Sequence, residues 1–199
     1  MNLQELAKKY ADEKKYGTIV KTLGSGYKGS SFLTNQNIVI KITSDKEEYS
    51  TALDIAKSSA NGEYTPHYFS FKYENPYYIL AMEKITPIKL NYKQQEFLNR
   101  FRDILLDGIE EGKNKKVFKN FITNKITPGE FSHILLGLID CVYGLHKVGI
   151  SNADIHEDNI GINEEGRIVM FDVVSANLVE SKSLIERLEK LTKKKVILK

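Results

Sequence analysis

Three polar side chains in the second half of the sequence are spaced as a phosphoryl-transfer reaction requires. Asp154 and Asn159 are five positions apart in one polar segment, and Asp172 comes thirteen positions after Asn159. A hydroxyl that attacks a phosphate needs a carboxylate to orient it and accept its proton, and Mg²⁺ needs oxygen ligands. We therefore expect Asp154 to orient the hydroxyl, and Asn159 and Asp172 to hold the metal. The alternative is that Asp154 and Asn159 only cap turns.

A predicted hairpin would bring these groups together. The segment Ile160–Met170 contains two short apolar runs separated by the polar turn Asn163–Gly166, and the second run leads through Phe171 into Asp172. Two strands joined in this way place their outer ends side by side. A helix predicted from about Pro128 to Lys147 would lead into the polar segment, with Cys141 on its apolar stripe in a packing role.

A glycine-rich segment lies near the other end of the chain. Gly24, Gly26 and Gly29, with Ser25 among them, lie between predicted strands over residues 18–22 and 31–33. Glycine lets backbone amides approach phosphates and permits positive φ values. A dinucleotide-binding fold requires a helix directly after such glycines, and here a polar turn and a second strand follow. The pattern favours a loop that covers phosphates.

Lys41 lies inside the apolar run Ile38–Thr43, which predicts a strand. An ammonium group there needs a phosphate or a carboxylate, unless the side chain merely reaches out to water. The next segment, residues 45–56, predicts a helix, and Glu48 lies on its apolar face. We expect Glu48 to pair with Lys41, with Glu47 as the alternative partner.

The sequence resembles the protein-kinase-like superfamily in the order of four features. These are the glycine loop, Lys41, the Asp154 loop with Asn159, and the Phe171–Asp172 pair. The resemblance covers residues 18–178. It implies an α+β, two-lobed fold, with a small antiparallel-sheet lobe over residues 1–85 and a reduced, mostly helical lobe over residues 86–199. It also implies that ATP and Mg²⁺ bind, with Gly24, Ser25, Gly26 and Gly29 covering the phosphates.

The same resemblance assigns the segment Tyr77–Ile85 to the strand and hinge that join the two lobes. Met82 is then the gatekeeper residue, and the chain from Glu83 to Ile85 lines the adenine slot. Lys41 and Glu48 position the phosphates. An ordinary buried strand is the alternative for this segment when it is taken alone.

The sequence also departs from the usual kinase pattern. Residues 152–154 are Asn-Ala-Asp where protein kinases have His-Arg-Asp, so we do not expect activation by loop phosphorylation. The Asp-x-His arrangement ending at His156 is similar to aminoglycoside and choline phosphotransferases. Val173 and Val174 replace Phe-Gly, which removes a glycine hinge. Only 27 residues follow Asp172, including a predicted helix over 183–191. We therefore expect either that a different surface, including residues 90–128, holds the substrate, or that a partner or a second copy of the chain completes the site.

These features predict transfer of the γ-phosphate of MgATP to a hydroxyl acceptor, with a protein favoured as the substrate. A small-molecule acceptor of the aminoglycoside or choline type is an alternative. A second alternative is a pseudokinase that binds nucleotide and acts as an interaction module. A third is nucleotidyl transfer, which the unchanged Asp154 disfavours.

Composition fits one compact, cytoplasmic unit of 199 residues that is 41% hydrophobic and 28% charged. The first residues lack the apolar core of a signal peptide, and no apolar stretch is long enough to span a bilayer. A single cysteine excludes an internal disulfide framework. The basic run Gly112–Lys119 is expected to be an exposed loop, and with a net charge of only +3 nucleic-acid binding is not expected.

Overall fold

The computed structural model describes residues 2–150, 155–171, 173, 188 and 191. The chain forms two compact units, Met1–Ile85 and Thr86–Lys199, each with its own sheet. Asp154, Asp172 and most of the helix predicted over 183–191 lie outside the described residues. Within the described ranges, no helix combines the length and the apolar character needed to cross a membrane.

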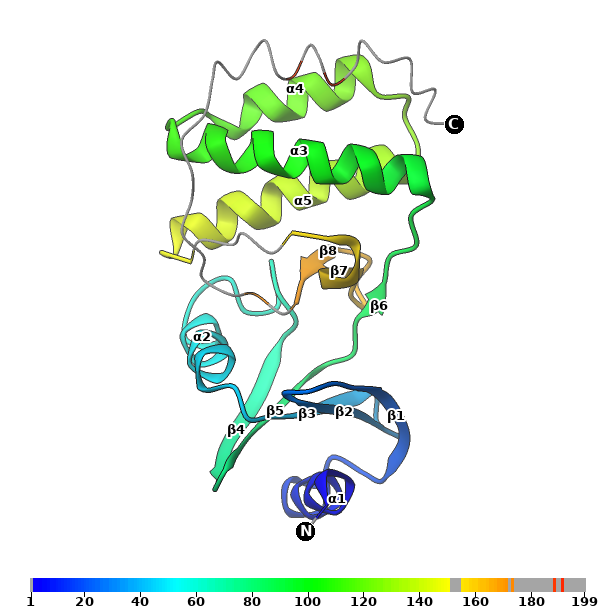
Figure 1. Ribbon diagram of the computed structural model, residues 1–199, viewed down its shortest axis with the longest axis vertical. Helices are drawn as coiled ribbons and strands as arrows, with labels where there is room; N and C mark the ends of the chain where they lie inside the picture. The colour runs from blue at the N-terminus through cyan, green and yellow to red at the C-terminus, as the bar shows by residue number, and fades with distance from the viewer. Residues whose placement is uncertain (1, 151–154, 172, 174–187, 189–190, 192–199) are drawn as a thin grey trace. The chain divides into compact units, whose positions relative to one another are not determined.

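A five-stranded antiparallel sheet with the order β1-β2-β3-β5-β4 forms the first unit (Figure 1). Its strands are β1 Ile19–Ser25, β2 Gly29–Thr34, β3 Ile38–Thr43, β4 Tyr68–Glu74 and β5 Tyr77–Glu83. Helix α1 (Leu3–Lys14) and helix α2 (Lys46–Ala56) lie on opposite faces of this sheet. The antiparallel sheet expected for this lobe from the sequence is confirmed.

Alternation along the strands separates an apolar face from the face that carries Lys41. Because successive strand residues point to opposite sides, Ile40 and Ile42 share one face and Lys41 lies on the other. The first face packs against α1 in a buried core made of Leu6, Ala7, Tyr10, Ala11, Phe32, Ile40, Ile42, Ile79 and Ala81. On the second face, Tyr49 of α2 packs against Phe71 and Tyr78.

Polar contacts fix α1 on its face of the sheet. The Tyr10 and Tyr16 hydroxyls each lie 2.8 Å from the Ser70 hydroxyl in β4. Burial raises the pKa of Tyr10. An ion pair at 2.6 Å joins Lys72 of β4 to Glu13 near the end of the helix. The first helix is therefore part of the core of this unit.

In the part of the second unit that the structure describes up to Phe171, three helices accompany a three-stranded sheet. They are β6 Thr86–Pro87, α3 Tyr92–Glu110, α4 Lys115–Lys125, α5 Glu130–Lys147, the 3-10 turn η1 Glu157–Asn159, β7 Ile160–Ile162 and β8 Ile168–Met170. Aromatic side chains from all three helices meet in the core, where Phe101 contacts both Phe97 and Phe118, and Phe97 contacts Phe131. Helix α5 packs against β8 of the β7–β8 hairpin.

The contact between α5 and β8 is close. A Cβ atom added to Gly137 would lie 2.6 Å from the side chain of Ile168, so only glycine fits at this position of the helix. One turn later, the Cys141 thiol donates a hydrogen bond to the Ile168 carbonyl oxygen at 3.0 Å. The packing role expected for Cys141 is confirmed, and α5 supports the hairpin directly.

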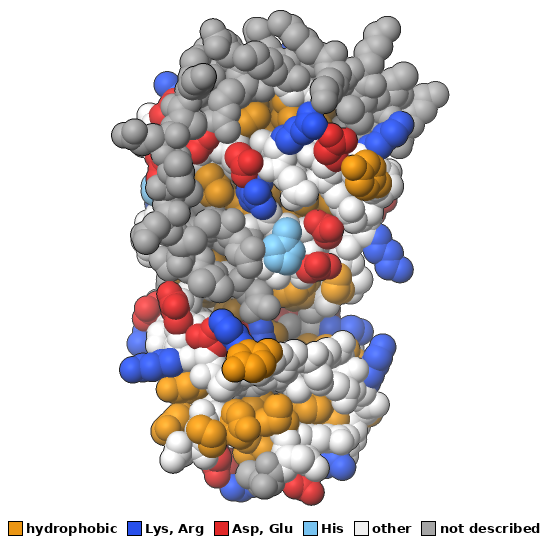
Figure 2. Space-filling view, viewed as in Figure 1, with side chains coloured by type: hydrophobic (Ala, Val, Ile, Leu, Met, Phe, Trp, Pro, Cys, Tyr) orange, Lys and Arg blue, Asp and Glu red, His pale blue; other side chains and the backbone are white. Residues whose placement is uncertain are grey.

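The basic run Gly112–Lys119 is not an exposed loop, because α4 begins within it at Lys115. Phe118 is fully buried, and Lys115 and Lys119 pair with Asp140 of α5 at 3.3 and 2.6 Å. Figure 2 shows that basic and acidic side chains are intermingled on the visible face of the described residues. The charge pattern suggested a loop because the buried phenylalanine is isolated among lysines in the sequence.

Candidate functional site

The glycine-rich segment forms a tight turn between β1 and β2. The Gly26 amide donates to the Gly29 carbonyl at 2.8 Å, and the Gly29 amide donates to the Gly26 carbonyl at 3.4 Å. Tyr27 and Lys28 lie at the tip, where Tyr27 is fully exposed. We call residues Gly24–Gly29 the glycine turn. The strand, turn and strand order expected from the sequence is confirmed.

The three glycines differ in whether the packing around them requires glycine. A Cβ atom on Gly29 would lie 1.9 Å from the Ile42 carbonyl oxygen, so close contact between β2 and β3 requires glycine there. A Cβ atom on Gly24 or Gly26 would meet no atom of the described residues within 4 Å. None of the three has a positive φ. The sequence-based argument from positive φ is therefore wrong for these positions, and Gly29 serves the packing of the sheet.

Lys41 lies in the middle of β3 and pairs with Glu48 of α2. The Lys41 Nζ atom lies 2.5 Å from the Glu48 Oε1 atom, and the side chains are only 20% and 14% exposed. Glu47 lies on the exposed side of the same helical turn. The structure thus places Glu48, and not Glu47, against the lysine. A sheltered ammonium group that is positioned by Glu48 is suited to binding a polyanion such as a triphosphate.

Asp45 fixes the start of the helix that carries Glu48. Its Oδ1 atom accepts hydrogen bonds from the amides of Glu47 and Glu48 at 2.9 and 3.3 Å. Its own amide donates to the Thr43 hydroxyl at 3.0 Å. This N-cap satisfies amides that have no partner within the helix. The helix begins one residue after the start expected from the sequence, because Asp45 is the cap.

The segment predicted to contact adenine occupies the end of β5 and the residues after it. Met82 pairs with Val39 across the sheet and therefore lies on the same face as Lys41. The Glu83 amide donates to the His67 carbonyl at 2.8 Å, and the Glu83 carboxylate accepts from the His67 amide at 3.2 Å. Ile85 is the last residue of the first unit. The adenine contacts of Met82, Glu83 and Ile85 stay predictions.

The second unit contains the described part of the polar segment. Asn159 ends η1 and is only 6% exposed, and its carbonyl oxygen accepts a hydrogen bond from the Phe171 amide at 3.0 Å. The hairpin thus brings Asn159 beside the residue that precedes Asp172, as the sequence predicted. Ile155 is fully buried, and its carbonyl oxygen accepts from Arg102 of α3 at 3.4 Å.

The chemistry of the residues fits a divalent cation bound through oxygen. Asn159 supplies an amide oxygen, which is a ligand that Mg²⁺ accepts, and the predicted second ligand is a carboxylate. Among the residues that the structure describes, no three His, Cys, Asp or Glu side chains gather as a metal site. Asp154 and Asp172 lie outside the residues that the structure describes, so their roles stay predictions.

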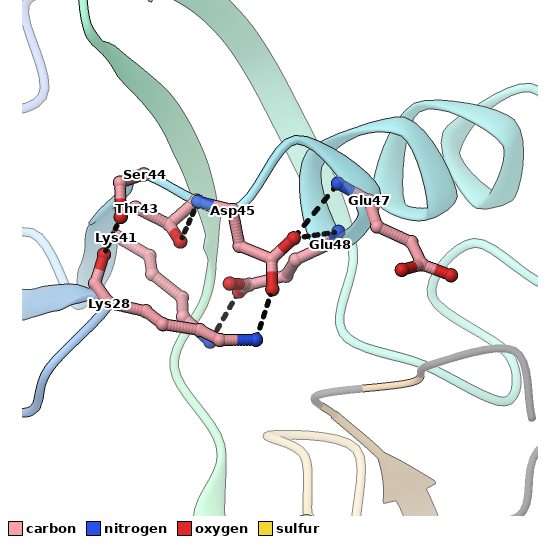
Figure 3. A network of polar contacts seen from close by, with 7 residues as sticks. All are labelled: Lys28, Lys41, Thr43, Ser44, Asp45, Glu47 and Glu48. Carbon is pink, nitrogen blue, oxygen red and sulfur yellow. Dashed lines mark hydrogen bonds and ion pairs between the residues drawn. The ribbon is translucent and has the colours of Figure 1, made fainter.

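The sequence analysis did not predict the contact between Lys28 and Asp45, whose side chains form an ion pair near Lys41 and Glu48 (Figure 3). Asp45 is marked in the sequence by its position before a predicted helix, which signals a cap. Nothing in the local sequence indicates that Lys28 is its partner, because the contact depends on how β2 and β3 pair.

Solved structures resemble this fold at low sequence identity. The kinase PK-1 of Cydia pomonella granulovirus matches with a TM-score of 0.50 and 19% identity, over 90% of this chain and 61% of that chain. The PknI kinase domain of Mycobacterium tuberculosis matches with a TM-score of 0.43 and 13% identity, over 80% of this chain and 60% of that one. The chain has a protein-kinase-like fold. Its kinase-like fold combines a small antiparallel-sheet lobe with a helical lobe.

The kinase-like chain spans about 60% of the length of the solved structures that it matches. No profile of a known protein family matches the sequence, and no curated protein matches it. The resemblance to these kinases therefore concerns the fold alone.

Proposed function

We propose that this protein is a phosphotransferase that moves the γ-phosphate of MgATP to a hydroxyl acceptor. The observation that carries the proposal is the sheltered ion pair between Lys41 and Glu48, 2.5 Å apart, within a kinase-like fold. The pair holds the Lys41 ammonium group in a sheltered position, from which it can bind phosphate oxygens. The open space beside Gly24 and Gly26 supports it, since no packing contact among the described residues requires glycine there.

Each residue has one task in this proposal. Lys41, positioned by Glu48, binds the α- and β-phosphates, and the glycine turn covers the phosphates. Asp154 orients the acceptor hydroxyl and takes its proton. Asn159 and Asp172 hold Mg²⁺, which when bound neutralises charge on the phosphate oxygens. A buried Asn159 beside the Phe171 backbone agrees with this role.

The test compares transfer of label from γ-labelled ATP by the wild-type chain and by Asp154→Asn and Asp172→Asn variants. We expect each substitution to lower the rate by at least about 100-fold, because a positioned base or metal ligand contributes that much to catalysis. Asp158→Asn is the matched control, since Asp158 lies in the same segment and its side chain is 88% exposed. Equal rates for all three variants would refute the proposal.

The acceptor is identified with a panel that contains proteins, small alcohols and aminoglycosides. A protein acceptor is favoured, and labelling of only the small molecules assigns the other class. Binding of MgATP without turnover on any acceptor would favour an interaction module. Label transferred only from the α-phosphate would identify nucleotidyl transfer, and both outcomes contradict the proposed phosphotransferase.

A further inference from the structure

The tip of the glycine turn is attached to the segment that leads into α2. The Lys28 Nζ atom lies 2.5 Å from the Asp45 Oδ2 atom (Figure 3). The Lys28 carbonyl oxygen also accepts hydrogen bonds from the Ser44 amide at 2.8 Å and from the Ser44 hydroxyl at 3.1 Å. Both the side chain and the backbone of Lys28 are therefore held by residues 44–45. We call Lys28, Ser44 and Asp45 the latch.

The two oxygens of the Asp45 carboxylate have separate partners. Oδ1 accepts from the amides of Glu47 and Glu48 and so caps α2, while Oδ2 accepts from Lys28. The Asp45 side chain is only 20% exposed, and its amide is tied to the Thr43 hydroxyl. One carboxylate thus connects the tip of the turn with the first turn of the helix.

The electrostatics of the pair agree with this geometry. The hydrogen bond from Lys28 lowers the pKa of Asp45, and the same contact raises the pKa of Lys28. The carboxylates of Glu48 and Glu47 also raise the pKa of Lys28 through their charge. Because the Lys28 side chain is 67% exposed, the ion pair alone is weak, and the two contacts of Ser44 with the backbone strengthen the attachment.

We propose that Lys28 and Asp45 are positioning residues that latch the glycine turn to the helix carrying Glu48. Contacts run without interruption from the turn to Lys28, Asp45, the first turn of α2, Glu48 and Lys41. The amides of the turn and the Lys41 ammonium group are then held in fixed relation for one triphosphate. The inference rests on the proposed function, because it assigns the latch to the same nucleotide site.

Two substitutions separate the latch from the helix cap. Asp45→Asn keeps an oxygen that can cap α2, since Asn and Asp cap equally well, but removes the charge that binds Lys28. Lys28→Met removes the ammonium group and keeps the length of the side chain. Glu47→Gln and Lys46→Met are the matched controls, because they remove the same charges from exposed positions in the first turn of α2. Lys28→Arg keeps the charge and should restore the wild-type behaviour.

The first measurement needs no nucleotide. Amide hydrogen exchange at Ser44 and Gly29, whose amides are hydrogen-bonded at the latch and in the turn, should become about two- to fivefold faster in Lys28→Met and Asp45→Asn, as loss of an exposed ion pair predicts. The double variant should exchange no faster than either single variant, because both remove the same contact.

The second measurement compares the dissociation constants of MgATP and adenosine. The turn covers phosphates and not the nucleoside, so each latch variant should weaken MgATP by about two- to fivefold and leave adenosine unchanged. A purely structural defect would weaken both ligands. The charge-removing controls and Lys28→Arg should leave the ratio of the two constants at its wild-type value.

Two results would overturn the latch. One is amide exchange in Lys28→Met that matches Lys46→Met, and the other is an additive effect in the double variant. Faster exchange with unchanged MgATP binding would refute the role in the nucleotide site. Failure of the wild-type chain to bind MgATP would instead refute the proposed function, while the exchange data would still decide whether the turn is attached to α2.

Discussion

Alanine substitutions at the three glycines of the turn should separate stability from nucleotide binding. Alanine at Gly29 should lower stability, whereas alanine at Gly24 or Gly26 should weaken nucleotide binding. Gly29→Ala disrupts the contact between β2 and β3, because the new Cβ atom would lie 1.9 Å from the Ile42 carbonyl oxygen. Gly24→Ala and Gly26→Ala place a methyl group in open space, and neither position has a positive φ. The three variants add the same atoms to the same turn.

The size of each effect follows from these distances. At Gly29 the strand has to shift by about 1 Å, and overpacking together with weakened backbone hydrogen bonds costs about 2–4 kcal/mol. For a chain of this size, that lowers the thermal unfolding midpoint by about 5–10 °C. Alanine at Gly24 or Gly26 should leave stability unchanged or raise it by up to about 1 kcal/mol, since alanine restricts the unfolded chain.

The affinity for MgATP should fall in the Gly24 and Gly26 variants, which keep their stability. A methyl group at Gly24 or Gly26 keeps backbone amides away from the phosphates, and one lost hydrogen bond to a charged group weakens MgATP about tenfold. Thermal unfolding and equilibrium binding of MgATP on the same preparations give both quantities. Tight MgATP binding by the Gly24 and Gly26 variants would refute the assignment of the turn to the phosphates. A Gly29 variant as stable as the wild type would refute the packing argument.

Two further predictions concern a sheltered ion pair and a raised pKa. Glu48→Ala should lower the free energy of unfolding by about 2 kcal/mol, since it removes a mostly buried carboxylate from Lys41. The control Glu47→Ala should change this free energy by less than about 0.5 kcal/mol. Equal values for the two variants in urea unfolding would contradict the prediction. Burial raises the pKa of Tyr143 to about 12, and its hydroxyl donates to the Lys113 carbonyl at 2.6 Å. Because the folded pKa exceeds the unfolded value of 10, this stability is full below pH 10 and is lost as pH rises toward 12. Tyr143→Phe should therefore be less stable at pH 8 and lose less stability between pH 10 and 12, and parallel urea-unfolding curves against pH would contradict the assignment.

Local patterns predicted the elements that hold the candidate site. Lys41 could be placed in a strand because apolar residues surround it, and Glu48 could be chosen because helical spacing puts it on the face with Ala52. The hairpin that joins Asn159 to Phe171 followed from two short apolar runs and a turn containing glycine. Each of these signals lies within about ten residues of sequence.

Features that depend on pairing between strands could not be predicted in this way. The closeness of Gly29 to the Ile42 carbonyl arises from the register of β2 and β3, which the sequence does not specify in advance. The contact of Lys28 with Asp45 has the same origin. Helix α4 was missed because its lysines are partly neutralised by Asp140, a residue of another helix.

The position of α1 has a practical consequence for anyone who shortens this protein. The helix covers Phe32, Ile40, Ile42 and Ile79 on the side of the sheet opposite Lys41, and the Tyr10 hydroxyl joins it to Ser70. Expression from residue 16 onward would expose an apolar face of the sheet, through which copies of the fragment can aggregate. A soluble fragment of the sheet unit should therefore begin at or before Asn2, the residue whose side chain caps this helix.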